Sequence, residues 1–323
     1  MKAIVIYEKG PGENLLLEDV ADPEPGLSDV IVEVSYSGIN HGDVIRRARG
    51  LFPQGVNPPY ILGLEGAGTV VKVGNNVQEF KVGQRVAFLV ESGGYAQRVR
   101  VPQTQLFQIP DEIPSHVAAG SVCVGMTAHH LVRLAGMEPG QSVLIHGGAG
   151  GVGSALIQFC KHQSVKVFTT VSSEDKAQFV RSLGADVVIN YRQSDFAQEI
   201  LVATEGVGVN YIFDGIGKEV VEGNFVCLSK RGHLLYYGSV SGYPQFPGEK
   251  VLMNEIRIIG FNLFGSVLRS RSLWNEGVDA LLTALSNGKL RIPVKILPMS
   301  GVVLAHEMLE KGEVCGKIVL NMQ

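Results

Sequence analysis

The most informative segment of this 323-residue chain reads Val143-Leu144-Ile145-His146-Gly147-Gly148-Ala149-Gly150-Gly151-Val152-Gly153. Gly148, Gly150 and Gly153 have the spacing GxGxxG, between an apolar run typical of a buried strand and a stretch typical of a helix. Glycines at this spacing allow a tight turn and close approach of a pyrophosphate, to which the start of the helix offers free N–H groups. A glycine-rich turn without a ligand is the alternative. The strand before, the helix after and a further strand about 20 residues on favour a dinucleotide site.

The end of that further strand bears on which dinucleotide binds. A site for NAD usually places an acidic residue there to hold the ribose 2′-hydroxyl. Here the strand, residues 165–171, runs into Ser172-Ser173-Glu174-Asp175-Lys176, with no acid at its end. Two hydroxyls and a lysine one helical turn later suit a 2′-phosphate, so the sequence favours NADPH over NADH. The same residues also make a good N-terminal cap for the next helix, and both interpretations can hold together.

Strands and helices alternate through the middle of the chain, and this alternation predicts an α/β fold with a parallel doubly wound sheet. The predicted strands cover residues 142–146, 165–171, 186–190, 210–213, 234–237 and 256–260, and the predicted helices cover residues 117–134, 154–162, 174–183 and 195–203. Before residue 115 the chain is β-rich instead: Val30, Val32 and Val34 alternate with other residues in a period of two. Prolines and glycines separate its short apolar runs, which predicts a small all-β or barrel-like unit.

Composition excludes several classes of protein. The 28 basic and 31 acidic side chains give a net charge of −3, which argues against a nucleic-acid-binding protein. The 45% apolar and 18% charged residues are typical of a folded chain, and its length predicts two domains. The four cysteines are scattered without a CxxC pair, which fits a reducing compartment. Glu8 comes too early for a signal peptide and glycines interrupt residues 142–160, so we expect a cytoplasmic protein without a membrane span.

A β-rich unit, a GxGxxG unit and a return segment together resemble the medium-chain dehydrogenase/reductase superfamily, and within it the zinc-independent quinone oxidoreductase (zeta-crystallin-like) family. The resemblance covers essentially the whole chain and rests on Ser37-Gly38-Ile39-Asn40 with Asp43, Ile61-Leu62-Gly63-Leu64-Glu65-Gly66-Ala67-Gly68, Gly125-Met126-Thr127-Ala128, residues 146–153, Ile189-Asn190-Tyr191 and Gly316-Lys317-Ile318-Val319-Leu320. Leu268-Arg269-Ser270-Arg271 is similar to the p53-inducible quinone oxidoreductase branch.

This resemblance implies a domain organisation. We expect a GroES-like β-rich catalytic domain over residues 1–120 and a Rossmann NADPH-binding domain over residues 121–261. Residues 262–323 would be a return segment that completes the catalytic domain, with a cleft between the two domains. The family also implies a homodimer that pairs its Rossmann sheets edge to edge, and a monomer in light scattering would exclude it.

Zinc can be tested position by position. The zinc-dependent alcohol dehydrogenases of this superfamily carry a cysteine and a histidine where this chain has Asn40 and Leu64. Cys123 falls near the third ligand position, but one thiolate cannot hold a zinc ion that needs three protein ligands. His41 is a lone histidine in a loop, so we expect no metal.

Without zinc or a flavin signature, the hydride is expected to pass directly from NADPH to an acceptor that needs little electrophilic help, a quinone or an α,β-unsaturated carbonyl, by positioning in a dry cleft. The resemblance implies three catalytic residues: Asn40, Asp43 and Thr127. It implies contacts to NADPH from Asn40, Thr127, Gly147, Gly148, Ala149, Gly150, Gly151, Val152, Ser172, Ser173, Lys176, Tyr191, Asp214, Gly215, Ile216, Tyr237, Gly238, Ser239, Phe264, Gly316 and Lys317. The substrate cleft would be lined by Ile45, Phe52, Tyr60 and Phe264.

Some of these residues have simpler explanations. Thr127 could pack within its helix, Tyr191 could belong to the core, and Lys317 could be an exposed strand residue. Ile45 stands where several family members carry a tyrosine, so a tyrosine proton donor is missing there. We therefore expect no dedicated general acid, with water protonating the product, although His41, Asp43, Phe52 and Tyr60 are possible substitutes.

Three functions stay open at this point. The first is an NADPH-dependent quinone reductase. The second is an alkenal or enone double-bond reductase of the prostaglandin or enoyl type, which the segment Ser172–Lys176 suits equally. The third is an NADPH-binding structural or regulatory protein with little turnover. In each case the partner is a small molecule, with no role for nucleic acid or membrane.

Overall fold

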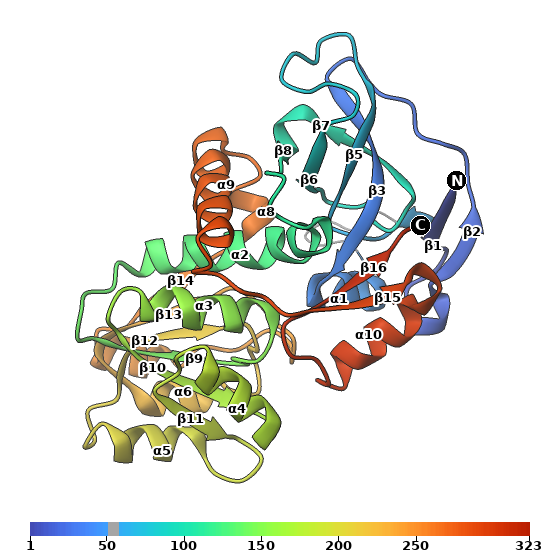
Figure 1. The fold of residues 1–323 in the computed structure, drawn as a ribbon. Coiled ribbons are helices and arrows are strands. Elements are labelled where there is room, and N and C mark those ends of the chain that lie inside the picture. The colour runs from blue at the N-terminus through green and yellow to red at the C-terminus, as the bar shows by residue number, and fades with distance from the viewer. Residues whose placement is uncertain (51–57) are drawn as a thin grey trace. The chain divides into compact units, whose positions relative to one another are not determined.

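The computed structural model describes residues 1–50 and 58–323, and the chain divides into two compact units (Figure 1). Unit 1 comprises Met1–Met126, Val267–Gly288 and Ile292–Gln323, and unit 2 comprises Thr127–Ser266 and Lys289–Arg291. Helix α2 (Ser115–Ala135) is continuous through the point where the chain passes from unit 1 to unit 2. Among the described residues, none of the helices combines the length and apolar character needed to cross a bilayer.

Unit 1 is built on two sheets. The smaller has the order β2-β1-β4, from Leu16–Asp19, Lys2–Ile6 and Tyr60–Ile61. The larger has the order β15-β16-β3-β5-β6-β8 with β7 paired to β3, from Val294–Pro298, Lys317–Asn321, Asp29–Ile39, Glu65–Val73, Arg85–Leu89, Leu106–Gln108 and, for β7, Arg98–Pro102. The helices of this unit are α1 (His41–Arg49), α9 (Arg271–Ser286) and α10 (Val302–Glu310), with short 3-10 turns at Gly12–Asn14, Gln103–Gln105 and Met299–Gly301.

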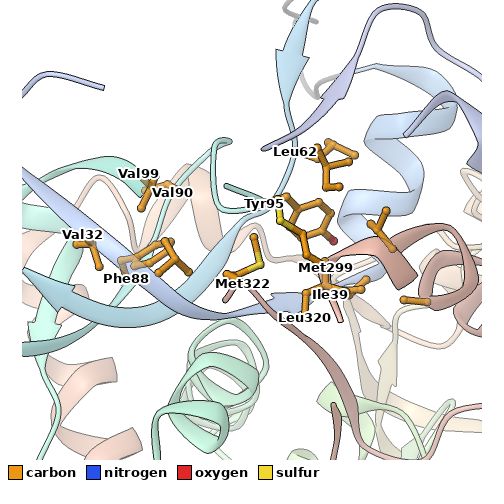
Figure 2. Close-up of a cluster of buried hydrophobic side chains, with 14 of the residues drawn as sticks. Val32, Ile39, Leu62, Phe88, Val90, Tyr95, Val99, Met299, Leu320 and Met322 are labelled. Carbon is orange, nitrogen blue, oxygen red and sulfur yellow. The ribbon is translucent and has the colours of Figure 1, made fainter. Parts of the chain in front are cut away.

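The period of two in β3 is confirmed, since Val30, Val32 and Val34 are buried and Glu33 is exposed. Ile31 is buried as well, because both faces of the sheet are covered at that point. The core of unit 1 brings together side chains from both ends of the chain, including Val32, Ile39, Phe88, Leu320 and Met322 (Figure 2). The C-terminal strand β16 makes this possible by pairing antiparallel with β3.

Unit 2 contains one six-stranded sheet in which every pairing is parallel, with the order β11-β10-β9-β12-β13-β14. Its strands are, in chain order, β9 (Ser142–Ile145), β10 (Lys166–Val171), β11 (Val187–Asn190), β12 (Val209–Asp214), β13 (Leu228–Tyr236) and β14 (Arg257–Gly260). Its helices are α3 (Gly151–Lys161), α4 (Glu174–Ser182), α5 (Phe196–Ala203), α6 (Val221–Cys227), α7 (Gly248–Met253) and α8 (Leu263–Ser266).

This strand order confirms the predicted α/β fold with a doubly wound parallel sheet, and the other unit is β-rich as predicted. The first strand of the sheet, β9, lies between β10 and β12, so the order reverses at β9. Ligands of such sheets bind beyond the carboxyl ends of the strands at this reversal. The fold therefore directs attention to the loops that follow β9, β10 and β12.

Candidate functional site

The glycine loop joins β9 to α3 as the sequence predicts. Gly147 adopts a left-handed backbone with φ +63°, and Gly150 is the N-cap of α3. A Cβ on Gly153 would lie 2.4 Å from the carbonyl oxygen of Gly147, so only glycine allows this close packing of helix and turn. The N–H groups in the first turn of α3 have no acceptors within the helix. The loop that contains residues 147–152 therefore has the geometry of an anion-binding turn.

The carboxyl ends of β10 and β11 bring the predicted 2′-phosphate residues together. Ser173 caps α4 by accepting the N–H of Lys176 at 3.4 Å, and the Lys176 ammonium donates to the Ser172 hydroxyl at 3.0 Å. Tyr191 directly follows β11, which pairs with β10, and its side chain is 52% exposed. The core alternative for Tyr191 is therefore wrong. Two hydroxyls, an ammonium and an accessible ring lie at the ends of neighbouring strands.

The loop after β12 is held against the loop after β13. Asp214 is buried, and its carboxylate accepts the N–H groups of Ile216 at 2.7 Å and Gly217 at 2.9 Å. A Cβ on Gly215 would lie 2.9 Å from the ring of Tyr237, and burial raises the pKa of that tyrosine. The structure thus brings together the predicted residues 214–216 and 237–239.

Two further predicted residues of unit 2 lie on helices. Thr127 is buried in α2, and Phe264 is half-buried in α8, where its N–H donates to the Asn262 side chain at 3.0 Å. Their roles in binding stay predictions.

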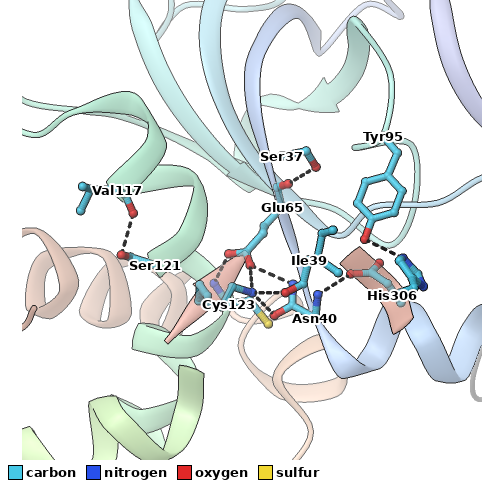
Figure 3. A network of polar contacts seen from close by, with 11 residues as sticks. Ser37, Ile39, Asn40, Glu65, Tyr95, Val117, Ser121, Cys123 and His306 are labelled. Carbon is cyan, nitrogen blue, oxygen red and sulfur yellow. Dashed lines mark hydrogen bonds and ion pairs between the residues drawn. The ribbon is translucent and has the colours of Figure 1, made fainter. Parts of the chain in front are cut away.

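In unit 1 the predicted residues Asn40 and Lys317 belong to one buried polar cluster. Figure 3 shows Asn40, Glu65 and Cys123 of this cluster. The Lys317 ammonium donates to the carbonyl oxygen of Ile39 at 2.6 Å, to Asn40 Oδ1 at 2.7 Å and to Glu65 Oε1 at 2.8 Å. Asn40 Nδ2 donates to the same Glu65 oxygen at 2.8 Å, while Glu65 Oε2 accepts the backbone N–H of Cys123 at 2.7 Å. Lys317 is 3% exposed, so the alternative of an exposed strand residue is wrong. An ammonium has three donors, and all three are used inside this cluster.

Asp43 lies next to this cluster at the start of α1. Its Oδ2 accepts the N–H of Asn40 at 2.9 Å. Burial raises the pKa of the Tyr95 phenol, and the Asp43 carboxylate lies close enough to that hydroxyl to raise it further. Complete burial raises the pKa of Asp43 to about 6. Two more buried polar groups of unit 1, Tyr95 Oη and His306 Nε2, are 3.3 Å apart, and burial lowers the pKa of His306 to about 3.

The residues predicted to line the substrate cleft are only partly placed. Ile45 is half-buried on α1. Tyr60 is buried, and its hydroxyl donates to the carbonyl oxygen of Arg46 at 3.0 Å. Phe52 lies outside the described residues.

The positions that correspond to zinc ligands do not fit a zinc ion. Leu64 is buried and has no ligand atom. Both polar atoms of the Asn40 amide are engaged, by Glu65 and Lys317. Burial raises the pKa of the Cys123 thiol far above its usual range, which disfavours the thiolate that zinc requires. The cation among these side chains is the ammonium of Lys317.

Sequence reasoning missed several buried polar residues around these loops. Glu65 and His146 lie inside motifs that were recognised, but neither was assigned a role. Asn224 carries no sequence signal at all, because a single asparagine in a helix has no distinguishing pattern. All three bind other side chains of the two candidate regions.

Comparisons with known proteins agree with this geometry. Residues 26–111 match the family model "Alcohol dehydrogenase GroES-like domain", and residues 151–283 match "Zinc-binding dehydrogenase". A quinone oxidoreductase of Pseudomonas aeruginosa is 35% identical over 99% of both chains, and a 2-haloacrylate reductase of Burkholderia is 33% identical over 99% of both chains. The solved structure of Escherichia coli quinone oxidoreductase complexed with NADPH has a TM-score of 0.95 at 28% identity, covering 99% of this chain and 100% of that one. This chain therefore belongs to the quinone oxidoreductase family of medium-chain dehydrogenases/reductases, a family of oxidoreductases.

Proposed function

We propose that this protein is an NADPH-dependent quinone oxidoreductase that transfers a hydride directly from NADPH to a quinone, without zinc or flavin. The observation that carries the proposal is the end of β10, where Ser172, Ser173 and Lys176 stand in place of an acidic residue. The relatives support it, since the Escherichia coli quinone oxidoreductase structure contains NADPH.

Each loop of unit 2 has a role in this proposal. The loop of residues 147–152 binds the pyrophosphate through N–H groups in the first turn of α3, because the N–H groups of Gly147, Gly148 and Gly150 already donate within the protein. Ser172, Ser173 and Lys176 bind the 2′-phosphate, and Tyr191 lies against the adenosine. Residues 214–216 and 237–239 form the nicotinamide side of the site, together with Phe264.

Unit 1 contributes Asn40 and Asp43. Bound NADPH would supply the hydride, and the protein would hold the cofactor and the acceptor in position. The Asn40 amide has one possible orientation, because its oxygen accepts from Lys317 and its nitrogen donates to Glu65. That orientation leaves the second N–H of the amide for a ligand. Asp43 fixes the backbone of Asn40 by accepting its N–H.

A double-bond reductase is the second candidate, and one observation favours it. The 2-haloacrylate reductase of Burkholderia is as similar to this chain as several quinone oxidoreductases are, and a solved structure of a 2-haloacrylate reductase has a TM-score of 0.85. A further structural neighbour is the enoyl-reductase-type cyclopropanase of curacin A biosynthesis, with a TM-score of 0.90 at 26% identity. Both candidates use the same cofactor residues and differ in the acceptor.

A panel of acceptors separates the candidates. Oxidation of NADPH would be followed with benzoquinone, a naphthoquinone, phenanthrenequinone, a 2-alkenal, an enone and 2-chloroacrylate, each repeated with NADH. We expect turnover with the quinones and NADPH. Turnover with only the alkenal, enone or haloacrylate would assign double-bond reduction instead. NADPH binding without turnover on any acceptor would favour the binding-protein alternative.

Replacing Lys176 with alanine is expected to raise the KM for NADPH roughly 10- to 100-fold, since one charge-assisted contact to a phosphate is worth about 1.5–3 kcal/mol. The KM for NADH should stay within about twofold, because NADH lacks the 2′-phosphate. Lys166→Ala is the matched control, since Lys166 starts the same strand at its opposite end. An equal loss with both cofactors in Lys176→Ala would show that Lys176 does not bind the 2′-phosphate.

A further inference from the structure

A chain of buried side chains links the glycine loop to the loop after β12. The N–H of Gly147 donates to Thr170 Oγ1 at 3.2 Å, and the same oxygen lies 3.2 Å from Nδ1 of His146. Nε2 of His146 is 2.7 Å from Oδ1 of Asn224, and Nδ2 of Asn224 donates to Oδ2 of Asp214 at 3.0 Å. The four side chains come from the ends of β10, β9 and β12 and from α6.

The far end of this chain is the Asp214 carboxylate. Its second oxygen accepts the N–H groups of Ile216 and Gly217. Together with Asn224, three N–H donors therefore surround Asp214. Two backbone N–H groups fill one oxygen of Asp214, so we take the carboxyl group as an ionised acceptor, although burial raises its pKa.

The carboxylate of Asp214 determines where the proton of each of these hydrogen bonds lies. Because the carboxylate only accepts, the amide nitrogen of Asn224 must face Asp214 and its oxygen must face His146. Nε2 of His146 must then carry hydrogen and donate. Burial lowers the pKa of His146, so the ring is neutral and its Nδ1 is an acceptor. The Thr170 hydroxyl donates to Nδ1, which leaves its oxygen free to accept the N–H of Gly147.

All four side chains of this series are shielded from bulk solvent. Thr170 and His146 are each 3% exposed, and Asn224 and Asp214 are fully buried. A broken link would leave a buried donor or acceptor unsatisfied, which costs more than the bond itself contributes. These hydrogen bonds also connect the ends of β9, where the strand order reverses, and of its neighbour β12.

We infer that Thr170, His146, Asn224 and Asp214 are positioning residues that hold the glycine loop and the loop after β12 in one fixed arrangement for the dinucleotide. This inference rests on the proposed function, because the ligand is NADPH. None of the four side chains needs to touch the cofactor. Thr170 acts through the N–H of Gly147, and Asp214 acts through the backbone of Ile216 and Gly217.

Thr170 offers a matched pair of variants. Thr170→Val keeps the shape of the side chain and removes the hydroxyl, whereas Thr170→Ser keeps the hydroxyl. We expect Thr170→Val to raise the Kd for NADPH, measured by calorimetry, roughly tenfold, and Thr170→Ser to stay within about twofold of the natural protein.

Ser142→Ala is the control for a general loss of stability. Ser142 and Asn210 join β9 to β12 at their amino ends through hydrogen bonds of 2.9–3.3 Å, away from both loops. This variant should lower the melting temperature as Thr170→Val does and leave the Kd within about twofold. Equal Kd values in folded Thr170→Val and the natural protein would overturn the inference.

The tautomer of His146 provides a test that needs no variant to fold. Nitrogen NMR of the histidine side chains should show His146 protonated on Nε2 and bare on Nδ1 at pH 7. A His146 ring protonated on Nδ1 would overturn the inferred hydrogen-bond arrangement. If the natural protein shows the expected tautomer but does not bind NADPH, the proposed function fails and the proton arrangement stands.

Discussion

Replacing Lys317 with methionine is expected to lower the free energy of unfolding of unit 1 by about 3–5 kcal/mol. Methionine fills nearly the same volume, so the loss does not come from a cavity. It comes from Glu65, which is fully buried and would lose the ammonium that lies 2.8 Å away. Removing one partner of a buried ion pair leaves an uncompensated charge, and this costs more than the pair contributes.

Trp274 makes the measurement specific. It is the one tryptophan of the chain, and it belongs to unit 1, as Lys317 and Glu65 do. Its fluorescence during urea unfolding therefore reports on the unit that is changed. The double variant Lys317→Met with Glu65→Gln carries no buried charge at this point, so it should recover at least half of the loss. A loss below about 1 kcal/mol in Lys317→Met would contradict the assignment of this ion pair.

Lys317→Met should also affect the candidate catalytic residue Asn40. Lys317 holds the oxygen of the Asn40 amide, so methionine would release that side chain from one of its two partners. Gly38 shows how closely the cluster is packed, because a Cβ there would lie 2.5 Å from Glu65 Oε1. Turnover should therefore fall in Lys317→Met, because the Asn40 amide loses the ammonium that fixes its orientation.

Lys317 also shows where prediction from the sequence ends. The glycine loop, the parallel strands and the cap at Ser173 were predicted correctly, because spacing and period within a few residues determine them. The surroundings of Lys317 depend on the pairing of β16 with β3, and its hydrogen bond to Ile39 joins residues 278 positions apart. The residues near Lys317 in the sequence do not indicate this pairing. The lysine was therefore expected at a cofactor or in solvent.

The partners of other buried polar groups are also distant in the sequence or apparent only in the packed structure. His146 was visible as part of a motif, yet its partner Asn224 is 78 positions away. Asp43 has the appearance of an ordinary residue in the first turn of a helix, and only the packed structure shows that it is fully buried. The resemblance to a family supplied the list of site residues, but the protonation and orientation of those residues required the fold.

Asp43 leads to the second large effect. The free energy of unfolding of unit 1 in Asp43→Asn, relative to that of the natural protein, is expected to be higher at pH 7 than at pH 4. The pKa of Asp43 is about 6 in the folded chain, against an ordinary value of 3.8. Each pKa unit corresponds to 1.36 kcal/mol, so the ionised carboxylate costs about 3 kcal/mol at pH 7. Asparagine has no charge to bury, and its oxygen can still accept the N–H of Asn40.

The sign follows from the protons bound in each state. Between pH 3.8 and about 6 the folded chain holds a proton on Asp43 that the unfolded chain has lost, so stability falls as the pH rises. His306 has the opposite effect, because its pKa is lowered to about 3 and folding is then favoured as the pH rises towards 6.5. The two slopes partly cancel in the natural protein. Only the difference between Asp43→Asn and the natural protein isolates Asp43.

That difference should grow by roughly 2 kcal/mol from pH 4 to pH 7, whatever constant offset the buried NH₂ group of asparagine adds. Urea unfolding of both proteins at each pH, followed by Trp274, measures it directly. A difference that does not change with pH would show that Asp43 has an ordinary pKa. If it does change, the natural protein keeps a buried carboxylate at a cost in stability, beside the backbone of Asn40, and such a cost is typical of functional sites. Asp43→Asn should then gain stability relative to the natural protein as the pH rises and be less active, and this combination separates a catalytic role from a structural one.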